Sequence, residues 1–362
     1  MHIISKCYYM KQYLDLLQNI LDNGVEKESG RANMPNTIGI SHGVIQMDLA
    51  NGFPLLTTKK MHLKGIIHEL LWILRGDTNI KYLVDNNVNI WNGDAYRWYL
   101  KFANESGYKK HKKFNTQDEF IEAIKSNNHD IIKEPSIFNL SNGGYTLGDL
   151  GKVYGQQWRN QHGVDQVKDV IEGLKNNPYS RYHIIDGWNK ADFLEMALPP
   201  CHLLYQFIVR PLTQEEMINY HITLPGDISL DEEELKKYFE EHVPKFYLDL
   251  NMYQRSCDSA LGVPYNLATM ALLLEIFSKA SNMIAGIATW IGGDTHIYVN
   301  HIETIKEQIK RTPYKLPNVK ILKDIKTLED ILKLTISDFE LHDYQSHEKI
   351  NYELFVGLKK KL

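Results

Sequence analysis

Hydrophobic residues recur at helical spacing in two segments near the start of the chain. Segment 8–22 carries an apolar stripe and ends at Asn23-Gly24, a stop signal (Tyr13, Leu16, Leu17, Ile20, Leu21). Segment 60–75 is apolar on most of its surface and ends at Gly76 (Leu63, Ile66, Ile67, Leu70, Leu71, Trp72, Ile73, Leu74). Since a helix that is apolar nearly all round is usually buried, the second segment is predicted to be a core helix.

Apolar and polar residues alternate in two later segments, which predicts strands. In 201–209 one face is expected to carry Cys201, Leu203, Tyr205, Phe207 and Val209. In 246–255 four apolar residues (Phe246, Leu248, Leu250, Met252) alternate with a more polar set that includes Arg255. Segment 38–56 is predicted to be extended and to end in a turn at 51–54.

Two further helices are expected in the second half of the chain. One follows Pro264, a favourable first-turn residue, and has its stripe at Leu267, Ala271, Leu274 and Phe277. The other is predicted to start at the N-cap pair Asp294-Thr295, with Ile302, Ile305 and Ile309 facing inward. Helices and strands that alternate without βαβ regularity favour an α/β fold of the α+β type.

Two polar blocks interrupt this pattern. Block 101–147 contains the run Lys109–Lys113 and a helix-like stretch, Asp118–Lys125. Block 211–245 contains Ser229 and Glu232, a capping-box signature for a short acidic helix. Both are predicted to be surface insertions in a single domain that spans 1–362.

Composition narrows the possible functions. The chain has 362 residues and a net charge of -4, which gives no general case for binding nucleic acid or membranes. Its three cysteines are too few for a disulfide framework, and its start lacks a signal peptide, so a cytoplasmic protein is expected. No dinucleotide motif, Walker loop or zinc spacing is present, so no metal is predicted.

Cys201 is the strongest candidate for chemistry, because Pro199 and Pro200 fix the approach of the chain to it. A thiol beside a cationic donor such as Arg255 becomes a nucleophile near neutral pH. The alternative is a small buried hydrophobe, which is the commoner role of a free cysteine.

Charged residues suggest an anion site and a proton-transfer group. Arg255 with Ser256, and Arg181 after a turn, are candidate anion binders, although either arginine could be an ordinary surface residue. Glu69 lies within the apolar helix. Burial would raise its pKa and suit it to acid–base work, whereas a thin polar stripe shared with His62 would leave it solvated.

Polar side chains near predicted helix starts could recognise a nucleoside. The amide of Asn266 can read the edge of a pyrimidine ring, since it both donates and accepts. His296 and Tyr298 could bind a sugar hydroxyl. The alternatives are a capping asparagine and a satisfied core pair.

Together these segments resemble the folate-dependent thymidylate synthase family, which uses a cysteine nucleophile. The resemblance covers most of the chain apart from the two polar blocks. It is carried by blocks in family order: 52–60 (GFPLLTTKK), 67–72 (IHELLW), 153–159 (VYGQQWR), 196–202 (MALPPCH), 254–258 (QRSCD), 261–266 (LGVPYN) and 292–298 (GGDTHIY).

The resemblance implies reductive methylation of dUMP to dTMP with 5,10-methylenetetrahydrofolate, which becomes dihydrofolate. Cys201 would add to C6 of dUMP and make C5 nucleophilic. Tyr154 with ordered water would remove the C5 proton, and Glu69 would manage proton traffic. The implied fold is a three-layer arrangement on a mixed sheet, in a homodimer.

The resemblance also implies ligand contacts. Arg31, Arg255, Ser256 and, across the dimer interface, Arg181 would hold the phosphate. The other residues implied in nucleotide binding are Gln254, Asn266 at the uracil edge, which also belongs to the catalytic set, and His296 with Tyr298 at the ribose. The folate residues implied are Asp258 at the pterin, which also belongs to the catalytic set, Trp91, Lys59 at the glutamyl tail, His62, Gly262 and Tyr265.

Several positions depart from the family pattern. The early phosphate loop reads 30–37 (GRANMPNT), Tyr182 replaces a second arginine, and Asp94 stands where Trp or Asn is typical. The chain also continues past Val356. A dUMP hydroxymethylase, in which water captures the methylene intermediate, is therefore an alternative. A non-catalytic nucleotide-binding paralogue is a third hypothesis.

Overall fold

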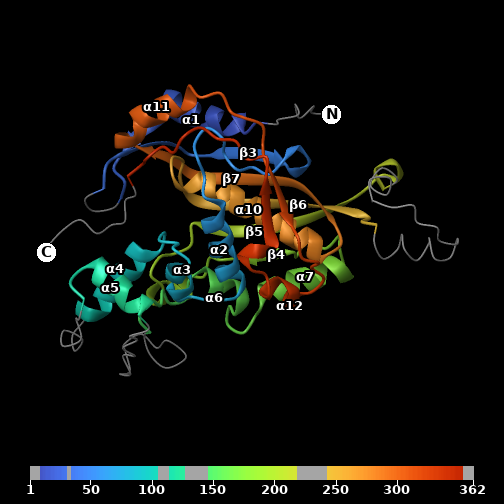
Figure 1. Cartoon of the computed structure of the whole chain (residues 1–362), viewed down its shortest axis with the longest axis horizontal. Helices are drawn as coiled ribbons and strands as arrows, with labels where there is room; N and C mark the ends of the chain where they lie inside the picture. The colour runs from blue at the N-terminus through green and yellow to red at the C-terminus, as the bar shows by residue number, and fades with distance from the viewer. Residues whose placement is uncertain (1–8, 31–33, 105–113, 127–145, 218–242, 354–362) are drawn as a thin grey trace.

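A seven-stranded sheet forms the centre of the computed structural model, which describes residues 9–30, 34–104, 114–126, 146–217 and 243–353 (Figure 1). The strand order is β1-β2-β7-β6-β5-β4, and β3 also pairs with β7. The strands are β1 (Val25–Lys27), β2 (Thr37–Ile40), β3 (Gly43–Asp48), β4 (Ile184–Asp186), β5 (His202–Pro211), β6 (Phe246–Asp258) and β7 (Ile284–Tyr298). A separate two-stranded sheet pairs β8 (Asn318–Ile321) with β9 (Phe339–His342).

The large sheet is mixed. β6 and β7 run parallel, while the other pairings are antiparallel. A parallel pair needs a crossover, and α10 (Gly262–Ala280) supplies it between β6 and β7. The mixed sheet confirms the predicted α/β fold class.

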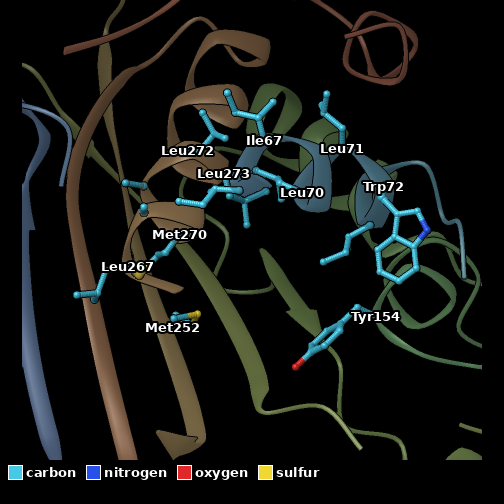
Figure 2. Packing of buried hydrophobic residues seen from close by; sticks show 14 of the residues in the cluster. Ile67, Leu70, Leu71, Trp72, Tyr154, Met252, Leu267, Met270, Leu272 and Leu273 are labelled. Carbon is cyan, nitrogen blue, oxygen red and sulfur yellow. The ribbon is translucent and has the colours of Figure 1, made fainter. Parts of the chain in front are cut away.

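Two helices build the core over the middle of this sheet. α10 lies on β6 and β7, and α2 (Leu63–Leu74) lies on α10. Figure 2 shows leucine, isoleucine and methionine side chains of the two helices meeting, with Met252 of β6 beneath them. The sheet, α10 and α2 thus form three layers. Because α2 is apolar on nearly every side, it is buried on nearly every side, as its pattern predicts.

The remaining helices surround this core (Figure 1). α1 and α11 lie together at one end, and α7 covers β4. α5, capped by the Thr116 side chain, packs Phe120 against Tyr96 and Tyr99 of α4. The bounds are α1 (Lys11–Asn23), α3 (Lys81–Asp85), α4 (Asn92–Asn104), α5 (Gln117–Lys125), α6 (Tyr154–Arg159), α7 (Gln166–Asn176), α11 (Ile302–Ile309) and α12 (Leu328–Leu332), with 3-10 turns at 49–51, 190–195, 299–301 and 336–338. The status of blocks 101–147 and 211–245 as insertions in one domain stays a prediction.

The predicted face of the first strand was wrong at Cys201. His202 lies opposite Gln254, but Leu204 lies opposite Tyr253, so Leu203 is an extra residue in β5. Such a bulge reverses the alternation. Consequently His202, and not Cys201, shares the face of Tyr205.

The predicted helix start at Asp294-Thr295 was also wrong. These residues lie inside β7, which pairs with β6 on one side and with β2 on the other. The next α-helix begins at Ile302. Pairing with two neighbours outweighs the local capping preference. His296 and Tyr298 therefore project from a strand.

Some predictions fall outside the described residues. These are the phosphate-loop residue Arg31, the run Lys109–Lys113, the Ser229 capping box and the extension past Val356.

One row of side chains crosses four strands on the face of the sheet away from α10. Val44, Ile291, Tyr253 and Leu204 occupy successive positions on β3, β7, β6 and β5. Val44 is 58% exposed and Tyr253 is 42% exposed. Within the described chain this row is therefore open to solvent at Val44 and Tyr253, while the next row on the same face is polar (Gln46, Thr289, Asn251, Gln206).

Candidate active site

The hydroxyl of Tyr154 holds the backbone at Cys201. Tyr154 is the first residue of α6, and its oxygen accepts N–H bonds from Cys201 at 2.7 Å and His202 at 3.3 Å. Burial raises the pKa of Tyr154 far above its ordinary value, and the charge of Cys201 adds to this. The phenol is therefore un-ionised at neutral pH. Figure 2 shows its oxygen pointing away from the helical core.

Arg255 braces the turn that precedes Cys201. Its backbone N–H donates to the Cys201 carbonyl at 2.9 Å. Its guanidinium donates to the carbonyls of Pro199 at 2.9 Å and Pro200 at 2.8 Å, and lies over the ring of Trp188. The backbones of Arg255 and Cys201 therefore meet, and a permanent cation lies against the two prolines that precede Cys201.

Glu69 connects the core helix to this cluster. Its Oε1 accepts the indole N–H of Trp91 at 2.9 Å, and the ring of Trp91 meets that of Tyr154 edge-on at 6.1 Å. Burial raises the pKa of Glu69 to about 7, although the Trp91 bond opposes the shift. A carboxyl group that titrates near neutrality can both give and take a proton.

A chain of amides orients Asn266. The indole N–H of Trp290 donates to Gln254 Oε1 at 2.9 Å, and Gln254 Nε2 donates to Asn266 Oδ1 at 3.0 Å. Because an indole can only donate, each amide in turn has its orientation set. Asn266 thus presents its NH₂ group away from Gln254.

His202 is a site residue that sequence reasoning missed. Burial lowers its pKa to about 4, against a hydrogen bond with Asn266, so it is neutral at pH 7. Its Nδ1 also meets the Tyr205 hydroxyl at 3.0 Å. Adjacency to Cys201 was the available signal.

His296 and Tyr298 come to the same region from β7. Their rings meet edge-on at 5.6 Å, and Asp258 of β6 pairs with His296. Asp258 Oδ1 accepts the N–H groups of Ala260 and Leu261, which shapes the turn into α10. Ser256 lies two positions earlier on the same strand, next to Arg255.

A pocket of about 130 Å³ lies beside this turn. Its lining is rich in lysine: Lys59, Lys60, His62, Leu261, Tyr265, Lys349, Ile350, Asn351 and Tyr352. Lys59 donates to the Ala260 carbonyl at 2.6 Å, and burial lowers its pKa to about 8, against the charge of Asp258. Lys59, His62 and Tyr265 were predicted at a ligand site. Lys349 and Tyr352, remote in sequence, were not.

Three predicted or unusual residues, Arg181, Tyr182 and Asp94, stand outside this cluster. Arg181 and Tyr182 are exposed in the turn before β4, with Tyr182 90% exposed, and the described contacts join neither to Cys201. Asp94, in the first turn of α4, forms an ion pair with Arg97. Gly262, by contrast, adjoins the cluster at the start of α10, where an added Cβ would make ordinary contacts with Asn266 and Asp258.

The described ranges contain neither a metal-binding cluster nor a membrane-spanning helix. No three His, Cys, Asp or Glu side chains there gather in a way that could hold a metal ion. No helix in the described part of the chain combines the length and apolarity needed to cross a membrane.

Comparison with known proteins decides the family. The sequence model of the thymidylate synthase family matches residues 11–356. The chain belongs to the thymidylate synthase family. It is 40% identical to a thymidylate synthase of Mesoplasma florum over 351 residues, which is 96% of this chain and 100% of the relative. It is 41% identical to that of Malacoplasma penetrans over 349 residues, with the same coverage.

A second kind of relative carries an additional activity in its name. A bifunctional dihydrofolate reductase-thymidylate synthase of Paramecium tetraurelia is 36% identical over 366 residues. The match covers 98% of this chain but 63% of that protein. The resemblance that the motifs carry is thus confirmed across nearly the whole chain.

Proposed function

We propose that this protein is a thymidylate synthase that converts dUMP to dTMP and 5,10-methylenetetrahydrofolate to dihydrofolate. The observation that carries the proposal is the joint hold of Tyr154 and Arg255 on the Cys201 turn, at 2.7 Å and 2.9 Å. A nucleophile and an anion-binding cation are fixed in one place, which suits attack on a phosphorylated substrate.

Tyr154 and Glu69 are the proposed proton-handling groups. Tyr154 accepts two backbone N–H bonds, so its own O–H can donate toward the substrate or a water molecule. Glu69, with its pKa raised by burial to about 7, can return a proton within the same site. In these roles the phenol of Tyr154 stays un-ionised.

The nucleotide is proposed to lie along the ends of β5, β6 and β7. Arg255 and Ser256 would bind the phosphate, and His296 with Tyr298 the ribose hydroxyl. Asn266 would donate from its NH₂ group to the O4 carbonyl of uracil, because Gln254 already occupies its Oδ1. Uracil fits this donor, whereas the exocyclic amine of cytosine opposes it.

The lysine-lined pocket is the proposed site of the folate. Its cations (Lys59, Lys60 and Lys349) fit the carboxylates of a glutamyl tail, and Tyr265 and Tyr352 offer apolar surface. Asp258 would meet the pterin through Oδ2, because Oδ1 already accepts two backbone N–H groups. Bound there, the folate supplies the one-carbon unit and the hydride.

A direct assay tests the activity. Purified protein is mixed with dUMP and methylenetetrahydrofolate, near-UV absorbance reports dihydrofolate, and mass spectrometry identifies the nucleotide. We expect dihydrofolate with dTMP, and no turnover by Cys201→Ser, which should still bind dUMP. Hydroxymethyl-dUMP without dihydrofolate would overturn the proposal, although nothing in the described residues favours that product.

We further propose a homodimer formed through the open face of the sheet. A row of apolar residues crosses four strands there, and Val44 alone is 58% exposed. A second copy can cover such a surface by packing its own sheet against it. Arg181, exposed in the turn before β4, would then serve the site of the partner.

Mixing two inactive variants tests this exchange. Arg181→Ala retains Cys201, and Cys201→Ser retains Arg181, so a mixed dimer contains one intact site. Random mixing should restore about a quarter of wild-type activity. A monomer by sedimentation, or no recovery on mixing after reversible dissociation, would contradict the shared site.

A cytosolic location is proposed from the chemistry. Cys201 and Cys257, the two cysteines of the described chain, form no disulfide there, which fits a reducing compartment. A thiol nucleophile keeps its function only where it is not oxidised.

A further inference from the structure

An ion-pair cluster lies next to the active site and belongs to none of its proposed ligand contacts. Lys152 Nζ lies 2.9 Å from Asp192 Oδ1 and 3.1 Å from Glu195 Oε2. The side chains of Lys152 and Asp192 are only 18% and 5% exposed. A charged cluster this well shielded from water is costly unless its geometry is well satisfied.

The buried carboxylate of Asp192 is fully engaged. Its second oxygen accepts from Gln157 Nε2 at 2.9 Å and from Asn189 Nδ2 at 2.8 Å, and His162 stands 3.7 Å away. Burial acts against both charges, yet the hydrogen bonds of the cluster raise the pKa of Lys152 and lower that of Asp192. Both groups are therefore ionised at neutral pH.

Backbone contacts bind the same two segments together. Lys152 N–H donates to the Glu195 carbonyl at 2.9 Å, and Ala197 N–H donates to the Leu150 carbonyl at 2.8 Å. Gly151 pairs with Met196 as an isolated bridge. The segment before α6 and the segment before the Cys201 turn thus lie side by side.

These contacts close a ring around the nucleophile. Lys152 lies two residues before Tyr154, and Glu195 lies six residues before Cys201. Tyr154 then bonds back to the N–H of Cys201 at 2.7 Å. The ion pair and the Tyr154 phenol both connect the segment before α6 to the segment before Cys201. A shift at the ion pair therefore changes the distance between the phenol and the Cys201 backbone.

We propose that Lys152 is a positioning residue for Cys201. Through Asp192 and Glu195 it fixes the 189–200 segment against the start of α6, and so sets where the phenol of Tyr154 meets the Cys201 backbone. The inference rests on the proposed function for its effect on turnover, but the placement of the thiol can be measured separately.

The test compares Lys152→Met with Lys152→Arg, which keeps the charge, and with Lys168→Met, which removes an exposed ion pair in α7. Steady-state kinetics gives kcat and KM for dUMP. The rate of Cys201 alkylation by iodoacetamide, corrected with Cys201→Ser for the other thiols, reports the thiol without any substrate.

We expect Lys152→Met to lower kcat and the alkylation rate on the order of ten-fold or more, with KM for dUMP changed by less than about two-fold. Lys152→Arg should restore most of both rates, and Lys168→Met should change neither. In a Tyr154→Phe background, Lys152→Met should have little further effect on alkylation, because the coupled contact is already gone.

A merely structural role would give a different result. Lys152→Met would then lower the midpoint of unfolding but leave kcat and alkylation of the folded enzyme at wild-type values, which would overturn the proposal. Should Lys152→Met fail to fold, Glu195→Gln removes only the 3.1 Å pair and must still slow alkylation. If the wild type were inactive while Lys152→Met still slowed alkylation of Cys201, the proposed function would be refuted and the positioning role of Lys152 would stand.

Discussion

The phenol of Tyr154, on α6, accepts a hydrogen bond from the backbone N–H of Cys201, just before β5. The N–H of Cys201 lies 2.7 Å from the Tyr154 oxygen, and the next N–H, of His202, lies 3.3 Å away. The nucleophile is thus held by a residue on another element, and not only by the prolines that precede it. Its position depends on long-range packing.

Tyr154→Phe should therefore affect both catalysis and stability. Loss of the acceptor leaves two partly buried N–H groups unpaired, which costs roughly 1–3 kcal/mol. Loss of the fixed O–H should lower kcat on the order of 10²-fold or more. Steady-state kinetics and urea unfolding measure the two effects. Tyr247→Phe, which removes a hydroxyl bonded to Glu216, is the control, and equal kcat losses in both variants would contradict the role.

Glu69 should give the pH profile a limb near pH 7. Burial raises its pKa from 4.5 to about 7, so the folded protein holds a proton that the unfolded chain has lost between these values. Stability attributable to Glu69 should therefore fall as pH rises from 4.5 to 7 and then level off. Glu69→Gln should remove the limb near 7 from kcat/KM and flatten this part of the stability curve. His202, with a pKa of about 4, cannot supply the limb.

Lys59 should make folate binding weaken in alkaline solution. Burial lowers its pKa to about 8, so its positive charge is lost as pH rises through that value. KM for methylenetetrahydrofolate should rise between pH 7 and 9 in the wild type and stay nearly flat in Lys59→Met. Lys64→Met, an exposed lysine of α2, is the matched control. A KM that rises equally in all three proteins would exclude Lys59 as the cause.

Three glycines separate the effects of steric clash, backbone strain and helix propensity. Gly151 has φ of +72°, and an added Cβ would lie 2.0 Å from the Glu195 carbonyl oxygen, so Gly151→Ala should cost at least about 2 kcal/mol. Gly163 has φ of +93° but open space around it, so Gly163→Ala should cost roughly 1–2 kcal/mol. Gly65, in α2 with nothing near its Cβ position, should gain roughly 0.5–1 kcal/mol on change to Ala. Urea unfolding of the three variants should give this order.

Local periodicity was sufficient to predict two of the elements that carry the site, α2 and β6. The apolar surface of α2 and the alternation in β6 are set by burial, which repeats along the sequence. Periodicity failed at Leu203 and at Asp294-Thr295. At both places a neighbouring strand decides the conformation, through an extra residue in β5 and through pairing of β7 from both sides.

The composition of the site was predictable only where residues adjoin in sequence or match a family block. Lys152 and Asp192 meet through tertiary packing. Nothing in the sequence around either residue indicates that the other is its partner. Tyr352 reaches the lysine pocket from near the end of the chain, where its hydroxyl donates to Gln308 at 2.6 Å. Such long-range polar contacts have no period, so one sequence cannot reveal them.

Asn266 should decide between uracil and cytosine, because its orientation is fixed by Gln254 and Trp290. Asn266→Asp would keep the acceptor for Gln254 but replace the outward NH₂ with a second acceptor. The kcat/KM for dUMP should fall about 10²-fold or more, while the ratio of dCMP to dUMP turnover rises. Competition assays with both nucleotides measure the ratio. Gln254→Leu removes the bond to Asn266 Oδ1 and leaves the amide held only by its hydrogen bond with His202, so it should weaken discrimination without favouring cytosine. Unchanged selectivity in both variants would place base recognition elsewhere in the site.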